Sequence, residues 1–360
     1  MSAQDPIRVL VIDDSAFSRR TIIRMLERSP LVEVVGWARD GEEALRKALE
    51  LPLDLITLDL EMPRMDGFTF LRLIMSKKPT PVMVISGRGG DQDVFKALEL
   101  GAVDFVAKPS PRATPELATI EQELIRKVHA IRQLRIDKLR RQISSAPCLV
   151  RSPAGARAAS RVVAIGASTG GPSALMQLFG AFAEAPPCAF VVSQHMPGGF
   201  TRGFAERLNR LTQLSAREAR DGDEPEAGTI LVAPGENHLE FAAKGDRVTA
   251  RLVPRRDGDK YAPAVDRMFE SAAKHYGSDL LAIVLTGMGD DGRRGVQAVK
   301  EHGGRVIAES EETAVIFGMP QRAIRTGFVD AVLPLYEIAA AIQSGIGKSE
   351  SKRIHRKGST

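Results

Sequence analysis

The feature that most constrains the fold is an alternation between short apolar runs and helix-like segments, which occurs twice along the 360 residues. Nearly continuous apolar runs separated by helices predict a parallel sheet that is covered on both faces. The first region therefore predicts a small doubly wound α/β domain with a five-stranded parallel sheet over residues 1–125. Its expected strands lie at residues 7–14, 31–38, 53–60, 81–86 and 103–108.

The second alternating region covers residues 161–347 and predicts another doubly wound α/β domain. Helical stretches are expected at residues 172–182 and 263–277, and some antiparallel hairpin character around residues 229–253. The apolar runs of this region lie at residues 161–168, 188–195, 228–235, 246–253, 280–287, 304–310 and 328–335.

Positive charge is concentrated outside these two regions. The whole chain carries +5, of which residues 126–161 contribute +9 and residues 348–360 contribute +4, so −8 remains for the rest. Proteins that bind nucleic acid usually carry a basic face on the folded domain, and the distribution therefore argues against a nucleic-acid partner. We predict that residues 126–160 form a basic linker, helical in part and flexible in part, and that residues 348–360 form a disordered basic tail.

Cysteine usage and hydropathy indicate a cytoplasmic protein without membrane insertion. Only Cys148 and Cys188 are present, which is too few for a disulfide framework and suits a reducing compartment. The first residues, MSAQDPIR, lack the apolar core of a signal peptide. The longest uncharged run, residues 162–183, is interrupted by GASTGGPS, which would leave backbone groups unpaired in lipid.

In the first region polar side chains follow four of the five expected strands. Asp13 and Asp14 follow the first strand, and Asp59, Ser86 and Lys108 end the third, fourth and fifth. The carboxyl ends of parallel strands meet in one crevice, so the three carboxylates would need a cation, and oxygen ligands suit Mg²⁺. Asp59 could attack a phosphoryl group as a nucleophile. Lys108 and the Ser86 hydroxyl would then bind the phosphate oxygens.

The stretches VLVIDDS, LDLEMPRMDG, VISG and VAKP resemble the receiver domain of bacterial response regulators over about the first 125 residues. The resemblance implies a flavodoxin-like receiver domain that a sensor histidine kinase phosphorylates on Asp59. It also implies Mg²⁺ held by Asp13 or Asp14 together with Asp59, and a cis bond between Lys108 and Pro109.

In the second region Ser168 lies where an expected strand meets the turn STGG and the helix PSALMQL. Gly166, Gly170 and Gly171 permit a tight turn, and Pro172 suits a first helical turn. The free N–H groups of the helix N-terminus could stabilise an oxyanion. They could equally hold a bound phosphate, and the turn alone does not decide between the two.

Two further residues favour a hydrolase, because a serine hydroxyl needs a base and a histidine base needs a carboxylate. His195 ends the strand AFVVSQ, and Asp291 follows LLAIVLTGMGD. In a parallel sheet both side chains would emerge at the same edge as Ser168. The order Ser, His, Asp and the absence of GxSxG exclude the usual α/β-hydrolase superfamily.

Alternatives remain open at this point. His195 could be an ordinary strand-end residue, and GDDG could be a simple turn. His238 and His275 are rival histidines in less telling contexts, and Asp290 is a rival to Asp291.

The motifs IGASTGGP, QHMPGGFT, APGENH and LTGMGDDG resemble the catalytic domain of the chemotaxis receptor methylesterases, the CheB family. The resemblance covers nearly the whole chain. It implies Ser168 as nucleophile, His195 as base and Asp291 as the residue that orients it, with an oxyanion hole near Thr169 and Met288. The esterase site would need no cofactor. The family commonly has Asn before the aspartate, where this chain has another Asp.

The implied function is phosphorylation-regulated hydrolysis of glutamate methyl esters on chemotaxis receptors through a serine acyl-enzyme, with deamidation of glutamines by the same route. The receptors would be the substrate and a sensor histidine kinase the phosphodonor. The basic linker, including Arg140 and Arg141, could help docking onto acidic receptor helices. One alternative is a non-enzymatic response regulator whose output domain binds a nucleotide or nucleic acid. Another is an amidase or esterase with a different protein substrate.

Overall fold

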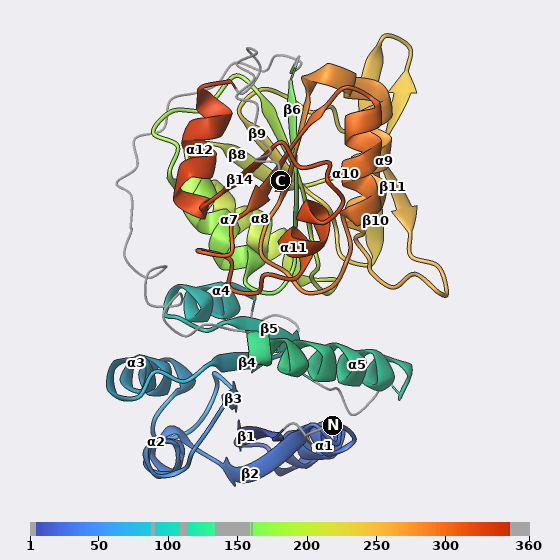
Figure 1. The fold of residues 1–360 in the computed structure, drawn as a ribbon. Helices are drawn as coiled ribbons and strands as arrows, with labels where there is room; N and C mark the ends of the chain where they lie inside the picture. The colour runs from blue at the N-terminus through green and yellow to red at the C-terminus, as the bar shows by residue number, and fades with distance from the viewer. Residues whose placement is uncertain (1–4, 88–90, 109–113, 134–158, 160, 346–360) are drawn as a thin grey trace, which may run out of the picture.

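The computed structural model describes residues 5–87, 91–108, 114–133, 159 and 161–345, and the chain folds into two α/β domains (Figure 1). Most of the expected linker, with Arg140 and Arg141, lies outside these residues, as do the expected tail and Pro109. The implied cis bond before Pro109 and the domain boundaries therefore stay predictions.

The N-terminal domain contains the five-stranded parallel sheet that the sequence predicts, in the order β2-β1-β3-β4-β5. Its strands are β1 (Ile7–Ile12), β2 (Val32–Ala38), β3 (Leu55–Leu58), β4 (Val82–Ser86) and β5 (Asp104–Ala107). The helices are α1 (Ala16–Glu27), α2 (Gly41–Glu50), α3 (Gly67–Lys77), α4 (Asp91–Glu99) and α5 (Thr114–Ala130), followed by the 3₁₀ turn η1 (Ile131–Gln133).

Three of these helices begin at side-chain caps that the sequence supplies. Ser15, Asp40 and Asp66 each accept a hydrogen bond from the backbone N–H three residues further along. Such caps satisfy N–H groups that a helix leaves free at its first turn. The chain can therefore turn sharply from each strand into the next helix and leave the strand-end carboxylates at the sheet edge.

Helix α5 is tied to strand β5 by a buried lysine. The Lys127 Nζ donates to the carbonyl of Phe105 at 2.6 Å and to Asp104 Oδ1 at 3.1 Å. A buried ammonium is tolerated when its charge is paired and its hydrogen bonds are made. The last strand and last helix of this domain therefore form one fixed unit.

The C-terminal domain contains a seven-stranded sheet in the order β14-β13-β12-β6-β7-β9-β8, with parallel pairing throughout. Its strands are β6 (Val162–Ala167), β7 (Ala189–Gln194), β8 (Ser215–Glu218), β9 (Thr229–Val232), β12 (Leu280–Val284), β13 (Arg305–Glu309) and β14 (Ala331–Leu333). Its helices are α7 (Gly171–Gly180), α8 (Phe200–Leu211), α9 (Val265–Tyr276), α10 (Arg293–Glu301), α11 (Met319–Ile324) and α12 (Leu335–Gln343), with the 3₁₀ turn η2 (Gly277–Asp279).

The two faces of this sheet are covered by different helices. Alternate residues of β6 belong to different apolar clusters, Ile165 to the one that includes α7, α8 and α12, and Ala164 to the one that includes α9, α10 and α11. This is the doubly wound arrangement that near-continuous apolar strands predict. Among the described residues, no helix is long and apolar enough to cross a membrane.

The structure refines the expected hairpin and adds two strands, β8 and β10 (Asn237–Lys244), that the apolar runs did not predict. Residues 229–232 belong to the parallel sheet, and the antiparallel hairpin consists of β10 and β11 (Arg247–Pro254). Strand β8 was not expected from the sequence because it is short, half-exposed and partly charged, so it shows no apolar run. It lies at the edge of the sheet, where such residues are tolerated.

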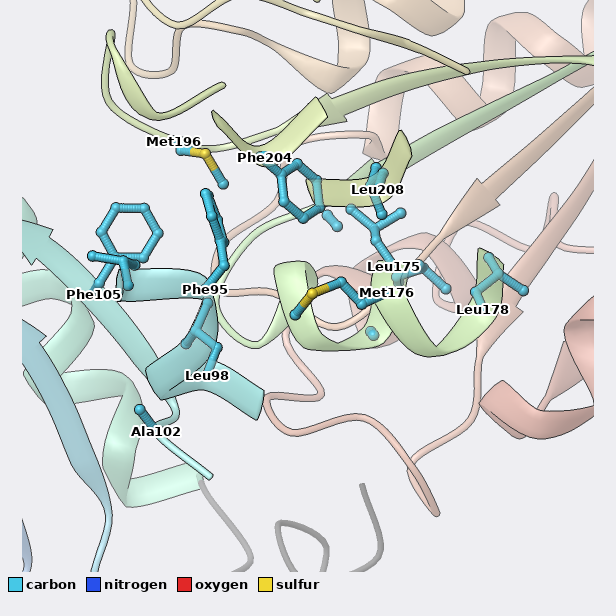
Figure 2. Packing of buried hydrophobic residues seen from close by; sticks show 14 of the residues in the cluster. Phe95, Leu98, Ala102, Phe105, Leu175, Met176, Leu178, Met196, Phe204 and Leu208 are labelled. Atoms are coloured by element: carbon cyan, nitrogen blue, oxygen red, sulfur yellow. The ribbon is translucent and has the colours of Figure 1, made fainter. Parts of the chain in front are cut away.

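The N-terminal domain packs on the C-terminal domain through α4, α5 and the edge strand β5, which form the side of the N-terminal domain that faces the C-terminal domain in Figure 1. Aromatic rings cross this interface. The ring centroid of Phe95 on α4 is 5.3 Å from that of Phe204 on α8 (Figure 2), and the ring centroid of Phe105 on β5 is 4.8 Å from that of Phe200 on α8. At its rim Arg207 pairs with Glu99, with Nε 3.0 Å from Oε1.

A second interdomain contact involves α5. Val315 and Ile316, in the connection after β13, share a buried apolar cluster with Leu124 of α5, and Met288 packs against the same cluster. The N-terminal domain therefore touches the loops at the carboxyl edge of the C-terminal sheet, where the sequence predicts the catalytic residues.

Candidate active site

Ser168 directly follows β6 and lies in a tight turn before α7. Its N–H donates to the carbonyl of Thr286 at 3.0 Å, and its carbonyl accepts from the N–H of Gly171 at 2.8 Å. Gly170 adopts φ 78°, a left-handed conformation that favours glycine. The turn that the sequence predicts therefore holds the buried Ser168 at the end of a central strand.

His195 occupies the corresponding position on the neighbouring strand. Strands β6 and β7 pair in parallel with Ala167 opposite Gln194, so Ser168 and His195 come next on each side. Gln194 Nε2 donates to the carbonyls of both residues, at 2.9 Å and 3.0 Å. Neighbouring strands lie about 4.8 Å apart, so this register makes Ser168 and His195 neighbouring residues at the sheet edge.

Asp291 lies on the other side of the imidazole. His195 Nε2 is 2.7 Å from Asp291 Oδ2, and both side chains are buried. Within the described residues His195 Nδ1 has no hydrogen-bond partner. A neutral imidazole that donates from Nε2 to a carboxylate keeps Nδ1 unprotonated, so Nδ1 is the nitrogen that could accept a proton from a serine.

The Asp291 carboxylate is held in its charged form. It accepts hydrogen bonds from the N–H groups of Val265 and Asp266, both at 2.8 Å, at the start of α9. Burial acts to raise the pKa of Asp291, but the hydrogen bond from His195, the electrostatic interaction with its ring and these N–H groups outweigh it and hold the pKa below its ordinary value. A charged Asp291 is the form that can stabilise an imidazolium.

The rival residues are placed elsewhere. Asp290 is 53% exposed and pairs with Lys260 at 2.9 Å, whereas the Asp291 side chain is 3% exposed. His238 is bonded to Asp259 at 2.9 Å, and His275 is exposed on α9. The burial of one aspartate beside His195 favours Asp291 as the partner, a choice that the motif GDDG leaves open.

Two backbone N–H groups near Ser168 could hold an oxyanion. In the described part of the chain, the N–H groups of Thr169 and Met288 donate no hydrogen bond. The segment before Met288 passes close to the serine, because a Cβ on Gly287 would lie 2.8 Å from Ser168 Cβ. Free N–H groups beside a nucleophile suit a developing negative charge.

The structure adds contacts that sequence reasoning missed. Tyr261 stacks on His195 with 4.3 Å between ring centroids and 8° between planes, and Gln194 anchors the two strand ends as described above. Gln194 directly precedes His195 in the sequence, and this position could have indicated that Gln194 lies at the site. No pattern pointed to Tyr261, because its contact depends on a connection that returns to the sheet edge from another part of the domain.

The N-terminal domain brings four of its five predicted site residues together. The ligand oxygens of Asp13, Asp14 and Asp59 lie within 4.8 Å of one another. Lys108 Nζ is 2.6 Å from Asp59 and 3.3 Å from Asp13. The Ser86 hydroxyl ends the next strand and donates to the carbonyl of Gly87 at 3.4 Å.

The charges in this cluster favour a divalent cation. Burial raises the pKa of Asp13 to about 6 despite the opposing charge of Lys108, and burial likewise raises the pKa of Asp59. One ammonium faces three carboxylates, so negative charge is left uncompensated. Carboxylate oxygens with room for water are the ligands that Mg²⁺ prefers, and these residues therefore fit the ion.

Comparisons with known proteins cover nearly the whole chain. The family model for the CheB methylesterase matches residues 163–342, and the model for the response regulator receiver domain matches residues 9–118. A solved structure of the Thermotoga maritima CheB methylesterase catalytic domain is similar with a TM-score of 0.50 and 42% sequence identity, covering 51% of this chain and 97% of that one.

Two relatives align with this chain over nearly the whole length of both proteins. The protein-glutamate methylesterase/protein-glutamine glutaminase 3 of Geobacter sulfurreducens is 52% identical, over 93% of this chain and 96% of the relative. A Myxococcus xanthus protein with the same name and the number 1 is 48% identical, over 95% of this chain and 98% of the relative.

Proposed function

The chain belongs to the CheB methylesterase family, and from this membership we propose that Ser168, His195 and Asp291 carry out its chemistry. The chain is a protein-glutamate methylesterase/protein-glutamine glutaminase joined to a receiver domain, and not a nucleic-acid-binding regulator. The observation that carries the assignment is the buried 2.7 Å contact between His195 and Asp291, on the strand next to the one that Ser168 follows.

The first half of the reaction forms an acyl-enzyme. His195 Nδ1 takes the proton of the Ser168 hydroxyl as its oxygen attacks the carbonyl carbon of a glutamyl methyl ester. The N–H groups of Thr169 and Met288 stabilise the oxyanion. Asp291 stabilises the imidazolium, which then protonates the departing methoxide so that methanol leaves.

The second half releases the product. His195 takes a proton from water, the water oxygen attacks the acyl carbon, and the Ser168 hydroxyl is regenerated as the glutamate carboxylate leaves. A glutamine amide follows the same route with ammonia as the leaving group.

Methanol release from a methylated chemoreceptor fragment tests this function directly, since an enzyme of this class must produce it and a mere binding protein would not. The proposed substrate places the enzyme in the cytoplasm, where the helical signalling part of a receptor lies.

We propose that the receiver domain controls this site through phosphorylation of Asp59 by a sensor histidine kinase. Asp13, Asp14 and Asp59 would hold Mg²⁺, which neutralises charge on the incoming phosphoryl group when bound. Lys108 and Ser86 would bind the phosphate oxygens.

The route from Asp59 to the catalytic domain is short. Lys108 follows β5, and the same strand carries Phe105 into the interface with Phe200. A phosphoryl group on Asp59 that binds Lys108 can therefore shift β5, the strand that contacts the catalytic domain. We propose that this shifts the population toward a form in which the receptor side chain reaches Ser168.

Replacing Asp59 with Asn is expected to abolish activation by a phosphodonor, because the amide cannot accept the phosphoryl group. The measurement is the rate of methanol release with and without acetyl phosphate and Mg²⁺. Asp66→Asn is the matched control, because Asp66 caps α3 and lies outside the acidic cluster. Activation of the Asp59 variant to the level of this control would refute the proposed switch.

Mg²⁺ affinity is expected to fall as the pH drops below about 6, the value to which burial raises the pKa of Asp13. A protonated Asp13 must lose its proton to bind the ion, so the affinity should fall by about tenfold per pH unit below that point. Calorimetric titration with Mg²⁺ across this range measures it. The Asp13→Asn variant should bind more weakly and lose most of the pH dependence. An affinity in the unaltered protein that does not change across this range would contradict the assignment of Asp13 as a ligand.

A further inference from the structure

Tyr261 lies half-buried in the connection between β11 and α9 and covers the imidazole of His195. The two rings are almost parallel, with planes 8° apart and centroids 4.3 Å apart. The phenol hydroxyl lies against Gly289, where any side chain would collide with it. The ring therefore fills a space that the loop before Asp291 leaves open for it.

The imidazole needs such a contact, because its hydrogen bonds alone do not fix it. One bond joins Nε2 to Asp291, and within the described residues Nδ1 has no partner. The imidazole could turn about the Nε2 contact and carry Nδ1 away from Ser168. A parallel ring stacked on the imidazole opposes that rotation and holds the imidazole plane in one orientation.

We propose that Tyr261 is a positioning residue that holds the plane of His195, and this rests on the proposed role of His195 as the base. The ring does not touch the reacting atoms in this account. It acts by keeping the base in the orientation that proton transfer needs, so its loss lowers the rate of chemistry more than the affinity for substrate.

The connection that carries Tyr261 is itself anchored by a buried side chain. Asp259 accepts from the buried His238 at 2.9 Å, whereas the pair of Lys260 with Asp290 at 2.9 Å is exposed and adds little. The same connection leads into α9, whose first N–H groups bind Asp291 as described above. The segment between β11 and α9 therefore supports both the face of the imidazole and the carboxylate beyond it. This also gives His238 of the APGENH motif a role, as an anchor of the connection.

The receiver domain reaches the same ring. The guanidinium carbon of Arg126, on α5, is 5.3 Å from the centroid of Tyr261. An alternative explanation for a loss of activity in Tyr261 variants is therefore a disturbed interdomain interface. A test must separate that role from positioning, and the Arg126→Gln variant does so because it removes the receiver's contact and leaves the stack on His195.

The experiment compares Tyr261→Leu with Tyr261→Phe in the full-length protein. We expect Tyr261→Leu to lower kcat for methanol release by about 100-fold with little change in KM. We expect Tyr261→Phe, which keeps the ring, to recover most of the loss. The rate at which a fluorophosphonate labels Ser168 should follow the same order, since it reports activation of the serine without receptor docking. Tyr261→Met supplies the same comparison if the leucine variant does not fold.

The same loss should persist in the Arg126→Gln background and in the presence of a phosphodonor. Labelling of Tyr261→Leu at the wild-type rate would overturn the inference, as would a phenylalanine variant as slow as the leucine variant. A loss that disappears with Arg126→Gln would assign Tyr261 to the interface instead. The proposed function has a separate test, because it is wrong if the Ser168→Ala variant still releases methanol. An inactive Ser168→Ala beside a fully active Tyr261→Leu overturns only the role of Tyr261.

Discussion

Replacing Ser168 with Ala is expected to lower kcat for methanol release by about 10⁴-fold or more, the loss typical of a triad nucleophile. The alanine cannot form an acyl-enzyme, and what activity remains would come from substrate binding and the oxyanion site. The variant should fold normally, because it removes a single oxygen atom at a turn held by backbone hydrogen bonds. Methanol release from a methylated receptor fragment measures the loss.

Ser193→Ala is the matched control for this change. Ser193 is also buried, lies on β7 two residues before His195, and its hydroxyl has no partner among the described residues. Ser193 has the same side chain as Ser168 and lies on the neighbouring strand, but it does not lie at the carboxyl end of that strand where the site residues are. The control should keep its activity. A Ser168→Ala protein as active as the Ser193→Ala protein would exclude Ser168 as the nucleophile.

The second large effect is expected from Asp291→Asn, which should lower kcat by about 10⁴-fold while the fold is retained. The amide is nearly isosteric with the carboxylate, so the fold should persist, but its N–H₂ group must face a backbone N–H that Asp291 binds in the unaltered protein, so some stability should also be lost. An amide carries no charge to stabilise the imidazolium, and its N–H₂ group can force His195 into the wrong tautomer. Steady-state kinetics of methanol release, together with thermal unfolding, separates lost chemistry from lost stability.

The neighbouring residue provides an internal comparison for this variant. Asp290→Asn makes the same chemical change one position earlier, on a side chain that is 53% exposed and paired with Lys260. Exposed ion pairs contribute little to stability, and this one does not contact His195. The rate should therefore change by no more than about two-fold. Equal losses in the two variants would mean that local charge, and not the hydrogen bond to His195, is what matters.

Much of the fold followed from apolar periodicity. Strands β1, β3, β4 and β5 and the central strands β6, β7 and β12 are almost entirely buried on both faces, so each appears in the sequence as a nearly unbroken apolar run. Strand β8 was missed because an edge strand with one exposed side carries no such run. Strand β10 was missed because Asn237, Glu240 and Lys244 interrupt its apolar residues, so the expected hairpin started at β9 instead.

The candidate site was predictable where it depends on strand ends. Ser168, His195 and Asp291 follow neighbouring strands of a parallel sheet, and this topology brings their positions to one edge. The choice between Asp290 and Asp291 was not predictable, because it depends on which of two adjacent carboxylates is buried.

The remaining contacts could not have been read from the sequence. Tyr261 meets His195, and Arg126 meets Tyr261, across separations that no periodicity encodes. The interdomain pair of Glu99 and Arg207 is of the same kind. Each depends on how the two domains and one connection pack, which is a property of the tertiary structure.

Activation of Ser168 by His195 can be measured by covalent labelling of the serine. The full-length protein and its His195→Gln variant are incubated with a fluorophosphonate, and mass spectrometry of peptides locates the adduct. We expect an adduct on Ser168 in the unaltered protein and almost none in the variant. An adduct on another serine, or labelling of Ser168 that is as fast without His195, would contradict this expectation.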